Sequence, residues 1–170
     1  MLSVTNSCTR LEPRKPLNEK KTSFLDASVI RNKRQYDLEQ QLFKTVMKRD
    51  TTLAYQSSQY GFWYAFKVQS TIEKPLPQKG DRVLFDYEIA DLNGTLLYSK
   101  EELGQITYYV DEEELLPALR EGIRMMRPGE EVVFLFPSYL CFGYLGDGEK
   151  IAINQPLRFT ISLLSLATGK

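Results

Sequence analysis

Apolar and polar residues alternate along the second half of the chain with the period of a half-buried strand. Between residues 82 and 90, Val83, Phe85, Tyr87 and Ile89 alternate with polar or charged residues, as expected when one face of a strand packs on a core. The run ends at Asp-Leu-Asn-Gly, which favours a hairpin turn. Similar patterns predict strands over residues 95–99, 105–110, 131–136 and 156–166. We therefore expect a mainly antiparallel sheet.

A single short helix is predicted among these strands, over residues 114–126. Pro117 suits its first turn and Arg127-Pro128-Gly129 ends it. Its apolar residues recur at helical spacing, as Leu115, Leu116, Leu119, Ile123 and Met126. One helix covers a five-stranded sheet only if the sheet bends around it. The predicted fold is therefore α+β, a bent antiparallel sheet wrapping one short helix, with an N-terminal helical extension.

The chain before this sheet divides into two segments. Residues 1–22 form the first segment, in which residues 9–22 are rich in Lys, Arg, Glu and Pro with almost nothing apolar, which indicates a disordered tether. Residues 23–77 predict a helix from Ser23 or Ser28 to about Arg49, amphipathic only in its second half, and then an aromatic strand within residues 51–70. A Pro- and Gly-containing segment follows. We expect the main domain to span residues 78–168 and to fold without the preceding extension; the alternative is that the aromatic strand joins the sheet.

Composition limits the chemistry that the chain can perform. The chain contains 42% hydrophobic and 26% charged residues, which is typical of a folded protein with one core. It has no histidine, so a Ser-His-Asp hydrolase or a His-bearing metal site is excluded. The net charge is zero, but the first 50 residues are basic and residues 81–170 acidic. A solvated basic helix explains this better than a nucleic-acid site.

The two cysteines differ in context. Cys141 lies in an apolar segment and is interpreted as a small buried hydrophobic residue. Cys8 follows Thr-Asn-Ser at the head of the polar tether, and this start resembles the end of a lipoprotein signal whose lipid-modified residue would be Cys8. The apolar part of such a signal is missing, so the start would have been trimmed or misassigned. The alternative is a cytoplasmic protein with an incidental cysteine.

The element order and two motifs resemble the FKBP-type peptidyl-prolyl cis/trans isomerases over residues 78–166. The motifs are the segment from Arg120 to Glu130 after the helix start and the Phe142-Gly143 pair before the last strand. Residues 14–16, 31–33 and 61–64 are also similar to a narrower branch, the gliding-motility-associated FKBP-type lipoproteins of Bacteroidetes. This resemblance implies a monomeric periplasmic protein that is anchored to the outer membrane through Cys8. Its partners would be proline-containing segments of envelope proteins, with no nucleic acid.

Such an enzyme needs no cofactor or metal. Rotation about a peptide bond faces a barrier of about 18–20 kcal/mol because resonance gives the bond double-bond character. An apolar, water-excluding site favours the less polar twisted amide. By resemblance, the catalytic residues are Tyr87, Leu97, Tyr98, Leu115, Leu116, Leu119, Phe142 and Phe159, with Ile106 and Ile151 as further substrate-binding neighbours. Any one of them alone would more often be a core residue.

Three positions depart from the best-studied family members. Tyr98 stands where they carry an aspartate that pairs with pocket tyrosines, and Leu119 stands where a tryptophan forms the floor. Phe142 replaces a tyrosine whose hydroxyl donates to a substrate carbonyl. These changes imply reduced isomerase activity. The alternative function is a non-catalytic chaperone or interaction module of the same fold, and a third is a purely structural lipoprotein.

Overall fold

The computed structural model describes residues 19–71 and 73–169. The described residues divide into two units, with the boundary between Arg34 and Gln35. The predicted tether and Cys8 lie outside the described residues, apart from the tether's last four positions. Helix α1, Glu19–Arg49, runs through the boundary between the units. It begins earlier than the predicted Ser23 or Ser28, because the Glu and Lys residues at positions 19–21 are good helix formers. No helix of the described residues is apolar and long enough to span a membrane.

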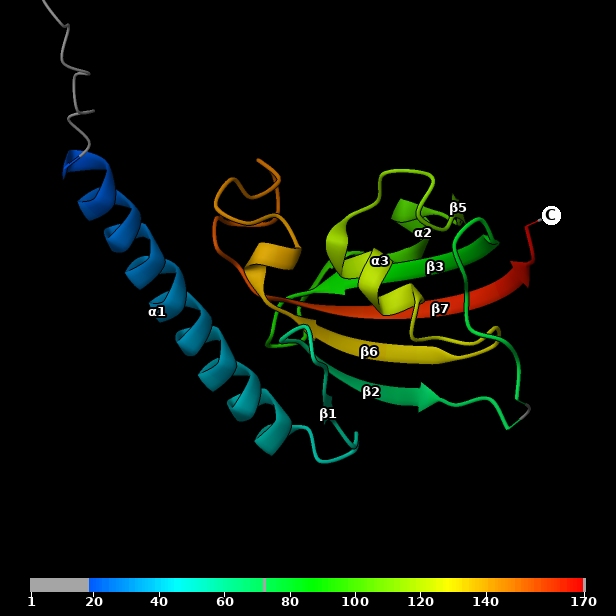
Figure 1. Ribbon diagram of the computed structural model, residues 1–170. Coiled ribbons are helices and arrows are strands. Elements are labelled where there is room, and N and C mark those ends of the chain that lie inside the picture. Colours follow the sequence, from blue (N-terminus) through cyan, green and yellow to red (C-terminus); the bar gives the residue numbers. More distant parts are fainter. Residues whose placement is uncertain (1–18, 72, 170) are drawn as a thin grey trace, which may run out of the picture. The chain divides into compact units, whose positions relative to one another are not determined.

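The second unit is built on a seven-stranded sheet in the order β1-β2-β6-β7-β3-β4, with β5 also paired to β3 (Figure 1). Every pairing is antiparallel. The predicted bent sheet with one short helix is thus confirmed, and its strands lie close to the predicted ranges. The strands are β1 Gln56–Ser57, β2 Trp63–Val68, β3 Arg82–Ala90, β4 Leu96–Tyr98, β5 Ile106–Tyr109, β6 Glu131–Phe136 and β7 Leu157–Ala167.

Strand β2 is a full member of this sheet, although it precedes the predicted domain. It pairs with β6 in register, with Tyr64 opposite Phe134 and Ala65 opposite Val133. Phe62, just before β2, is fully buried in the main core and lies 4.9 Å from Phe136 between ring centroids. A boundary at residue 77 therefore cuts through the sheet, and the structure favours the alternative in which the aromatic strand belongs to the domain.

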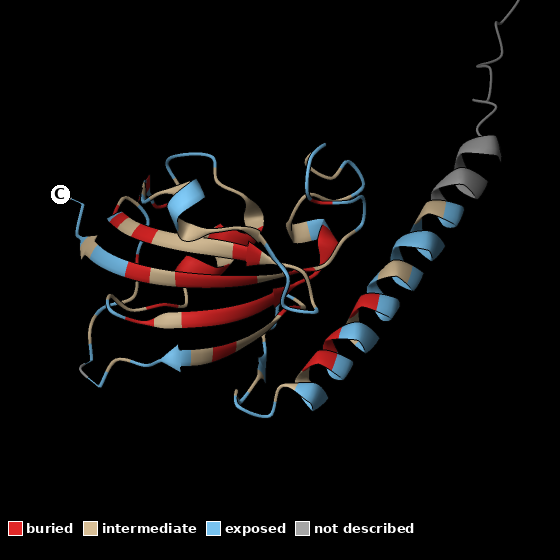
Figure 2. Cartoon of the chain, turned by 180° about the vertical axis from the view of Figure 1, so that it is seen from behind, coloured by how far each residue is buried: buried red, intermediate tan, exposed pale blue. Residues whose placement is uncertain are grey.

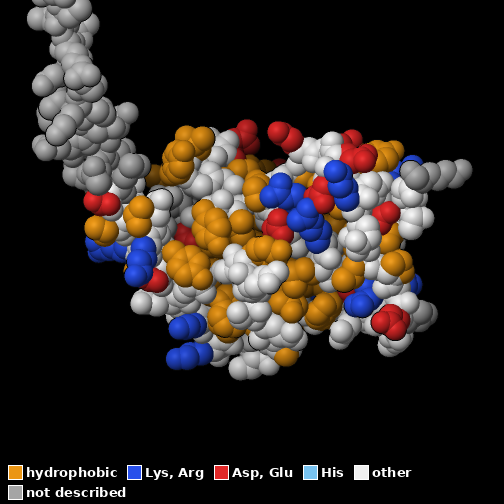
Figure 3. All heavy atoms as spheres, in the orientation of Figure 1, with side chains coloured by type: hydrophobic (Ala, Val, Ile, Leu, Met, Phe, Trp, Pro, Cys, Tyr) orange, Lys and Arg blue, Asp and Glu red, His pale blue; other side chains and the backbone are white. Residues whose placement is uncertain are grey.

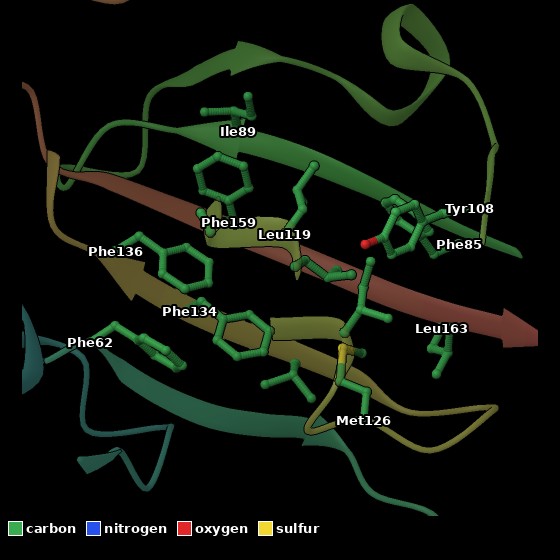
Figure 4. Close-up of a cluster of buried hydrophobic side chains, with 14 of the residues drawn as sticks. Phe62, Phe85, Ile89, Tyr108, Leu119, Met126, Phe134, Phe136, Phe159 and Leu163 are labelled. Atoms are coloured by element: carbon green, nitrogen blue, oxygen red, sulfur yellow. The ribbon is translucent and has the colours of Figure 1, made fainter. Parts of the chain in front are cut away.

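The main core lies between the inner face of the sheet and helix α3, Pro117–Ile123 (Figure 4). The helix is shorter than the predicted 114–126. Pro117 disfavours helical geometry at the residue before it, and after Ile123 the chain continues in tight turns that still bury Met126. Gly122 allows the close approach of helix and sheet, since a Cβ there would lie 3.2 Å from Ile161 and 3.3 Å from Phe134. Two short elements complete this unit, α2 Lys100–Leu103 and the 3-10 helix η1 Ser138–Leu140.

The second half of α1 covers part of the other sheet face. Phe43 and Val46 are buried against Leu135 of β6, with Trp63 at the edge of this smaller cluster. Figure 2 shows that the buried positions of α1 lie in its second half. Gln40 fixes the contact, because its side chain accepts from Trp63 Nε1 at 2.8 Å and donates to the carbonyl of Gly61 at 2.8 Å. Residues 26–34, in the first unit, are almost all exposed. The prediction that α1 is amphipathic only in its second half is confirmed.

Candidate functional site

The edge of β3 that carries β4 and β5 has a gap. Strand β5 pairs with Arg82–Phe85, and β4 pairs with Ile89 and Ala90. Within the described residues, these pairings leave positions 86–88 without a strand partner on that side. Helix α2 connects the two short strands, and Lys100 Nζ at its start lies 3.1 Å from Asp86 Oδ1. Tyr87 therefore lies in a segment of β3 that has no strand partner on that side and that faces α2 instead.

Tyr87 lies on the inner face of the sheet, within this segment of β3. Its ring stacks on Phe159 of β7, with centroids 5.9 Å apart and planes at 5°, and lies 6.0 Å from the ring of Phe85. Phe85, Ile89 and Phe159 project toward α3 in Figure 4, and the alternation along β3 places Tyr87 on the same side. Burial raises the pKa of the Tyr87 hydroxyl, so it stays neutral at ordinary pH. The site has an aromatic wall with one neutral hydroxyl.

All ten residues predicted for the site contact one apolar cluster. Ile106 lies opposite Phe85 on β5, and Tyr98 lies opposite Ile89 on β4. Three of the ten are buried in the cluster: Leu119, Ile151 and Phe159. The other seven are half-buried and pack against it: Tyr87, Leu97, Tyr98, Ile106, Leu115, Leu116 and Phe142. The ten residues therefore lie within the main core or at its margin.

The segment between β6 and β7, residues 137–156, carries Phe142 and is here named the closing loop. Its Asp147 Oδ1 accepts from the backbone N–H of Glu149 at 2.9 Å and of Ile151 at 2.8 Å. Asp147 Oδ2 accepts from the hydroxyl of Tyr98 at 2.5 Å. The loop is therefore attached to β4 by a hydrogen bond from Tyr98.

This hydrogen bond shifts the pKa of both partners. The bond to Asp147, aided by desolvation, raises the pKa of Tyr98 to about 12. Desolvation alone would raise the pKa of Asp147, but the bonds from Tyr98, Glu149 and Ile151 lower it to about 2. Lys150 adds a second link, because its Nζ lies 4.3 Å from the Tyr98 ring centroid and 2.6 Å from Glu102. The Tyr98 hydroxyl is thus already occupied within the protein.

A buried carboxylate holds the start of the closing loop. Glu39 of α1 is 1% exposed and accepts from Ser138 N–H at 3.1 Å, Ser138 hydroxyl at 2.6 Å and Gln35 Nε2 at 2.7 Å. Gln35 also donates to the carbonyl of Asn154 at 3.2 Å. Sequence reasoning missed Glu39, although its spacing to Phe43 and Val46 is i, i+4, i+7. It missed Asp147 as well, whose partner lies far away in sequence.

A charged hollow of about 660 Å³ adjoins the site and shares Leu115 with it. Its lining includes Lys79, Arg120 and Arg124, together with several carboxylates. Figure 3 shows side chains of both charges gathered on this face beside apolar ones. Arg124 forms an ion pair with Asp111 in this lining. The hollow suits polar groups, whereas the apolar cluster around Tyr87 suits an aliphatic ring.

Two further observations concern reactive groups. Cys141 is half-buried, packs against the main core and forms no disulfide. Burial raises the pKa of its thiol well above the ordinary value. Both observations agree with the interpretation of Cys141 as a small apolar residue. Among the described residues, no group of three His, Cys, Asp or Glu side chains is placed to hold a metal ion.

The sequence model of the family described as FKBP-type peptidyl-prolyl cis-trans isomerase matches residues 73–164. The chain belongs to this family. It is 30% identical over 102 residues to the probable FKBP-type isomerase FkpA of Neisseria meningitidis, covering 59% of this chain and 37% of that protein. It is 32% identical over 96 residues to the isomerase FKBP9 of Mus musculus, covering 55% and 17%. The chain thus spans less than two fifths of the length of either relative.

Solved structures show the same fold. A peptidyl-prolyl cis-trans isomerase from Pseudomonas syringae pv. tomato has a TM-score of 0.62 at 18% identity, covering 80% of this chain and 96% of that one. FkpA from Escherichia coli has a TM-score of 0.62 at 19% identity, covering 89% and 72%. The fold of this FKBP-type chain is therefore confirmed independently of its sequence match.

Proposed function

We propose that this FKBP-type protein is a peptidyl-prolyl cis-trans isomerase whose site is the apolar cluster around Tyr87 and Phe159. The observation that carries the proposal is the half-buried aromatic wall at the gap in the β3 edge, in a chain of this family. Proline in the substrate would pack on this wall, with Leu119 beneath it and Phe142 of the closing loop beside it. The family membership and the packing of all ten predicted residues on one cluster support this assignment.

Catalysis at such a site would come from its environment. The twisted amide of the transition state is less polar than the planar amide, so an apolar surround that excludes water stabilises it relative to the ground state. No side chain in the cluster has to act as a nucleophile. Uncatalysed isomerisation takes tens to hundreds of seconds, so even an enzyme of reduced activity would accelerate the folding of its clients. The departures at Tyr98, Leu119 and Phe142 support such a reduced rate.

We further propose that the protein acts in the cell envelope, on periplasmic clients, as an outer-membrane lipoprotein acylated at Cys8. The support is the sequence around Cys8 and the resemblance to gliding-motility-associated lipoproteins. Proteins of the gliding motility machinery would be among the clients. Expression from the native gene, followed by membrane fractionation of the protein and of Cys8→Ser, tests this location. A Cys8→Ser protein that still fractionates with membranes contradicts acylation at Cys8.

The proposed activity is tested with a proline-containing peptide in a protease-coupled assay. We expect the full chain to increase the cis-to-trans rate in proportion to its concentration. The alternative, a non-catalytic interaction module, is favoured by the exposed Leu145 and Ile153 on the closing loop, which are 78% and 65% exposed. Peptide binding without acceleration would support that alternative, and the absence of both would support a purely structural role.

A further inference from the structure

A substrate bound in this site needs a hydrogen-bond donor for its backbone. An extended peptide that packs on apolar side chains loses water from its carbonyl groups, and a buried carbonyl without a partner is costly. Phe142, beside the proposed proline position, has no hydroxyl. The donor must therefore come from another residue of the site.

Most tyrosine hydroxyls near the site are already engaged. Tyr98 donates to Asp147 at 2.5 Å, and Tyr139 donates to the carbonyl of Tyr60 at 2.8 Å. Tyr108 is buried, and its hydroxyl accepts from the N–H of Asp111 at 3.0 Å. The hydroxyls of Tyr98 and Tyr139 therefore donate within the protein, and Tyr108, whose hydroxyl only accepts, is 2% exposed and too deeply buried for a substrate to reach.

Tyr87 differs from these three residues. In the part of the chain that the structure describes, its hydroxyl has no hydrogen-bond partner, whereas its ring is fixed by stacking on Phe159 and by contact with Phe85. The residue is only half-buried, so part of its side chain is open to solvent, and it lies in the segment of β3 between the pairings with β5 and β4. A fixed ring with an unused donor is an arrangement suited to binding an acceptor.

We propose that the Tyr87 hydroxyl donates a hydrogen bond to a substrate backbone carbonyl next to the turning amide bond. The acceptor is not the carbonyl of the turning bond itself, because a bond there would stabilise the polar, planar amide and slow rotation. Tyr87 thereby has two roles, an aromatic wall for proline and a donor that sets the register of the peptide. The expected change in kcat/KM rests on the proposed function, whereas the expected change in peptide affinity does not.

The test compares Tyr87→Phe, which removes only the hydroxyl, with the unchanged protein on one Xaa-Pro peptide. Peptide affinity is measured by fluorescence titration, and kcat and KM by the isomerase assay. We expect affinity and kcat/KM to fall by about 2- to 10-fold, mainly through KM, because the bond is made in ground state and transition state alike. Urea unfolding of both proteins checks that the folded state is equally populated.

Two further variants make the result specific. Tyr144→Phe removes a hydroxyl from a closing-loop tyrosine that is 78% exposed, and it should leave affinity unchanged. Adding Phe142→Tyr to Tyr87→Phe should restore affinity, because it returns a donor to the site. Unchanged affinity in Tyr87→Phe overturns the inference, even if the protein is an active isomerase. If the unchanged protein shows no isomerase activity, the proposed function fails, and the affinity comparison alone decides whether Tyr87 is the donor.

Discussion

Removal of the Glu39 carboxylate tests whether α1 holds the closing loop. In Glu39→Ala, the N–H and hydroxyl of Ser138 lose their acceptor, while Ser138 itself is only 3% exposed. The freed side chain of Gln35 can turn to solvent, so its lost bond costs little. The effect should therefore arise at Ser138, at the start of the loop that carries Phe142.

The magnitude follows from the two bonds to Ser138. A hydrogen bond to a charged group contributes about 1.5–3 kcal/mol, and a buried donor left without a partner costs about 1–3 kcal/mol. Removing a desolvated carboxylate offsets part of this loss. We expect Glu39→Ala to reduce the free energy of unfolding by about 2–5 kcal/mol. Glu39→Gln keeps one acceptor oxygen and should cost about 1–2 kcal/mol.

Urea unfolding, followed by tryptophan fluorescence of Trp63, measures both variants. Asp37→Ala is the matched control, because Asp37 is an exposed acidic residue of the same helix and its removal should change the free energy by less than about 0.5 kcal/mol. A loss below about 0.5 kcal/mol in Glu39→Ala would mean that Ser138 finds other partners at no cost and that Glu39 does not hold the closing loop.

Three further predictions concern the loop, the sheet and the pocket. The raised pKa of Tyr98 predicts that the stabilisation from its bond to Asp147 is fully present below about pH 10 and is lost as the pH rises through about 12. The lowered pKa of Asp147 predicts that it is also lost as the pH falls through about 2. Absorbance titration should show a tyrosine component that ionises near pH 12 and moves back toward 10 in Asp147→Asn, while the other tyrosines are unchanged. A chain beginning at residue 78 should lack a cooperative urea transition, because it loses β2 and Phe62, whereas a chain beginning at residue 35 should keep it. Phe142→Ala should lower the isomerase rate, and its loss of unfolding free energy should be well below the roughly 3–5 kcal/mol expected for truncation of a core phenylalanine. Phe142→Tyr should hold or raise the isomerase rate. If Phe142→Ala is strongly destabilised but its folded fraction keeps the full specific rate, Phe142 belongs to the core.

The strands and the short helix could be predicted because their patterns are local. Alternation at Val83, Phe85, Tyr87 and Ile89 reports one buried face, and it gave β3 to within a residue or two. The partner of β2 could not be predicted, because pairing with β6 joins segments about 70 residues apart and no local pattern encodes it. The length of α3 was overestimated, since apolar spacing continues through turns that are no longer helical.

The packing of the proposed apolar site residues on the core could be predicted, whereas the polar contacts near them could not. Side chains such as Leu119 and Phe159 are fixed by periodicity and by their place in the fold, so the resemblance located them in one cluster. The contacts that hold the closing loop are pairings across the sequence, between Tyr98 and Asp147 and between Glu39 and Ser138. A glutamate on a surface helix is exposed far more often than buried, so only the three-dimensional structure reveals that Glu39 is buried and bonded to Ser138.

The site assignment is tested most directly by the exchange rate between cis and trans forms of an Xaa-Pro peptide, measured by NMR with the full chain and with Tyr87→Ala. An active site around Tyr87 predicts that the rate rises in proportion to the concentration of the unchanged protein. It also predicts that this rise is largely lost when the aromatic wall is removed, while the protein stays folded. A folded, unchanged protein that produces no rise in the rate, or a Tyr87→Ala protein that retains it in full, would contradict the assignment of the site.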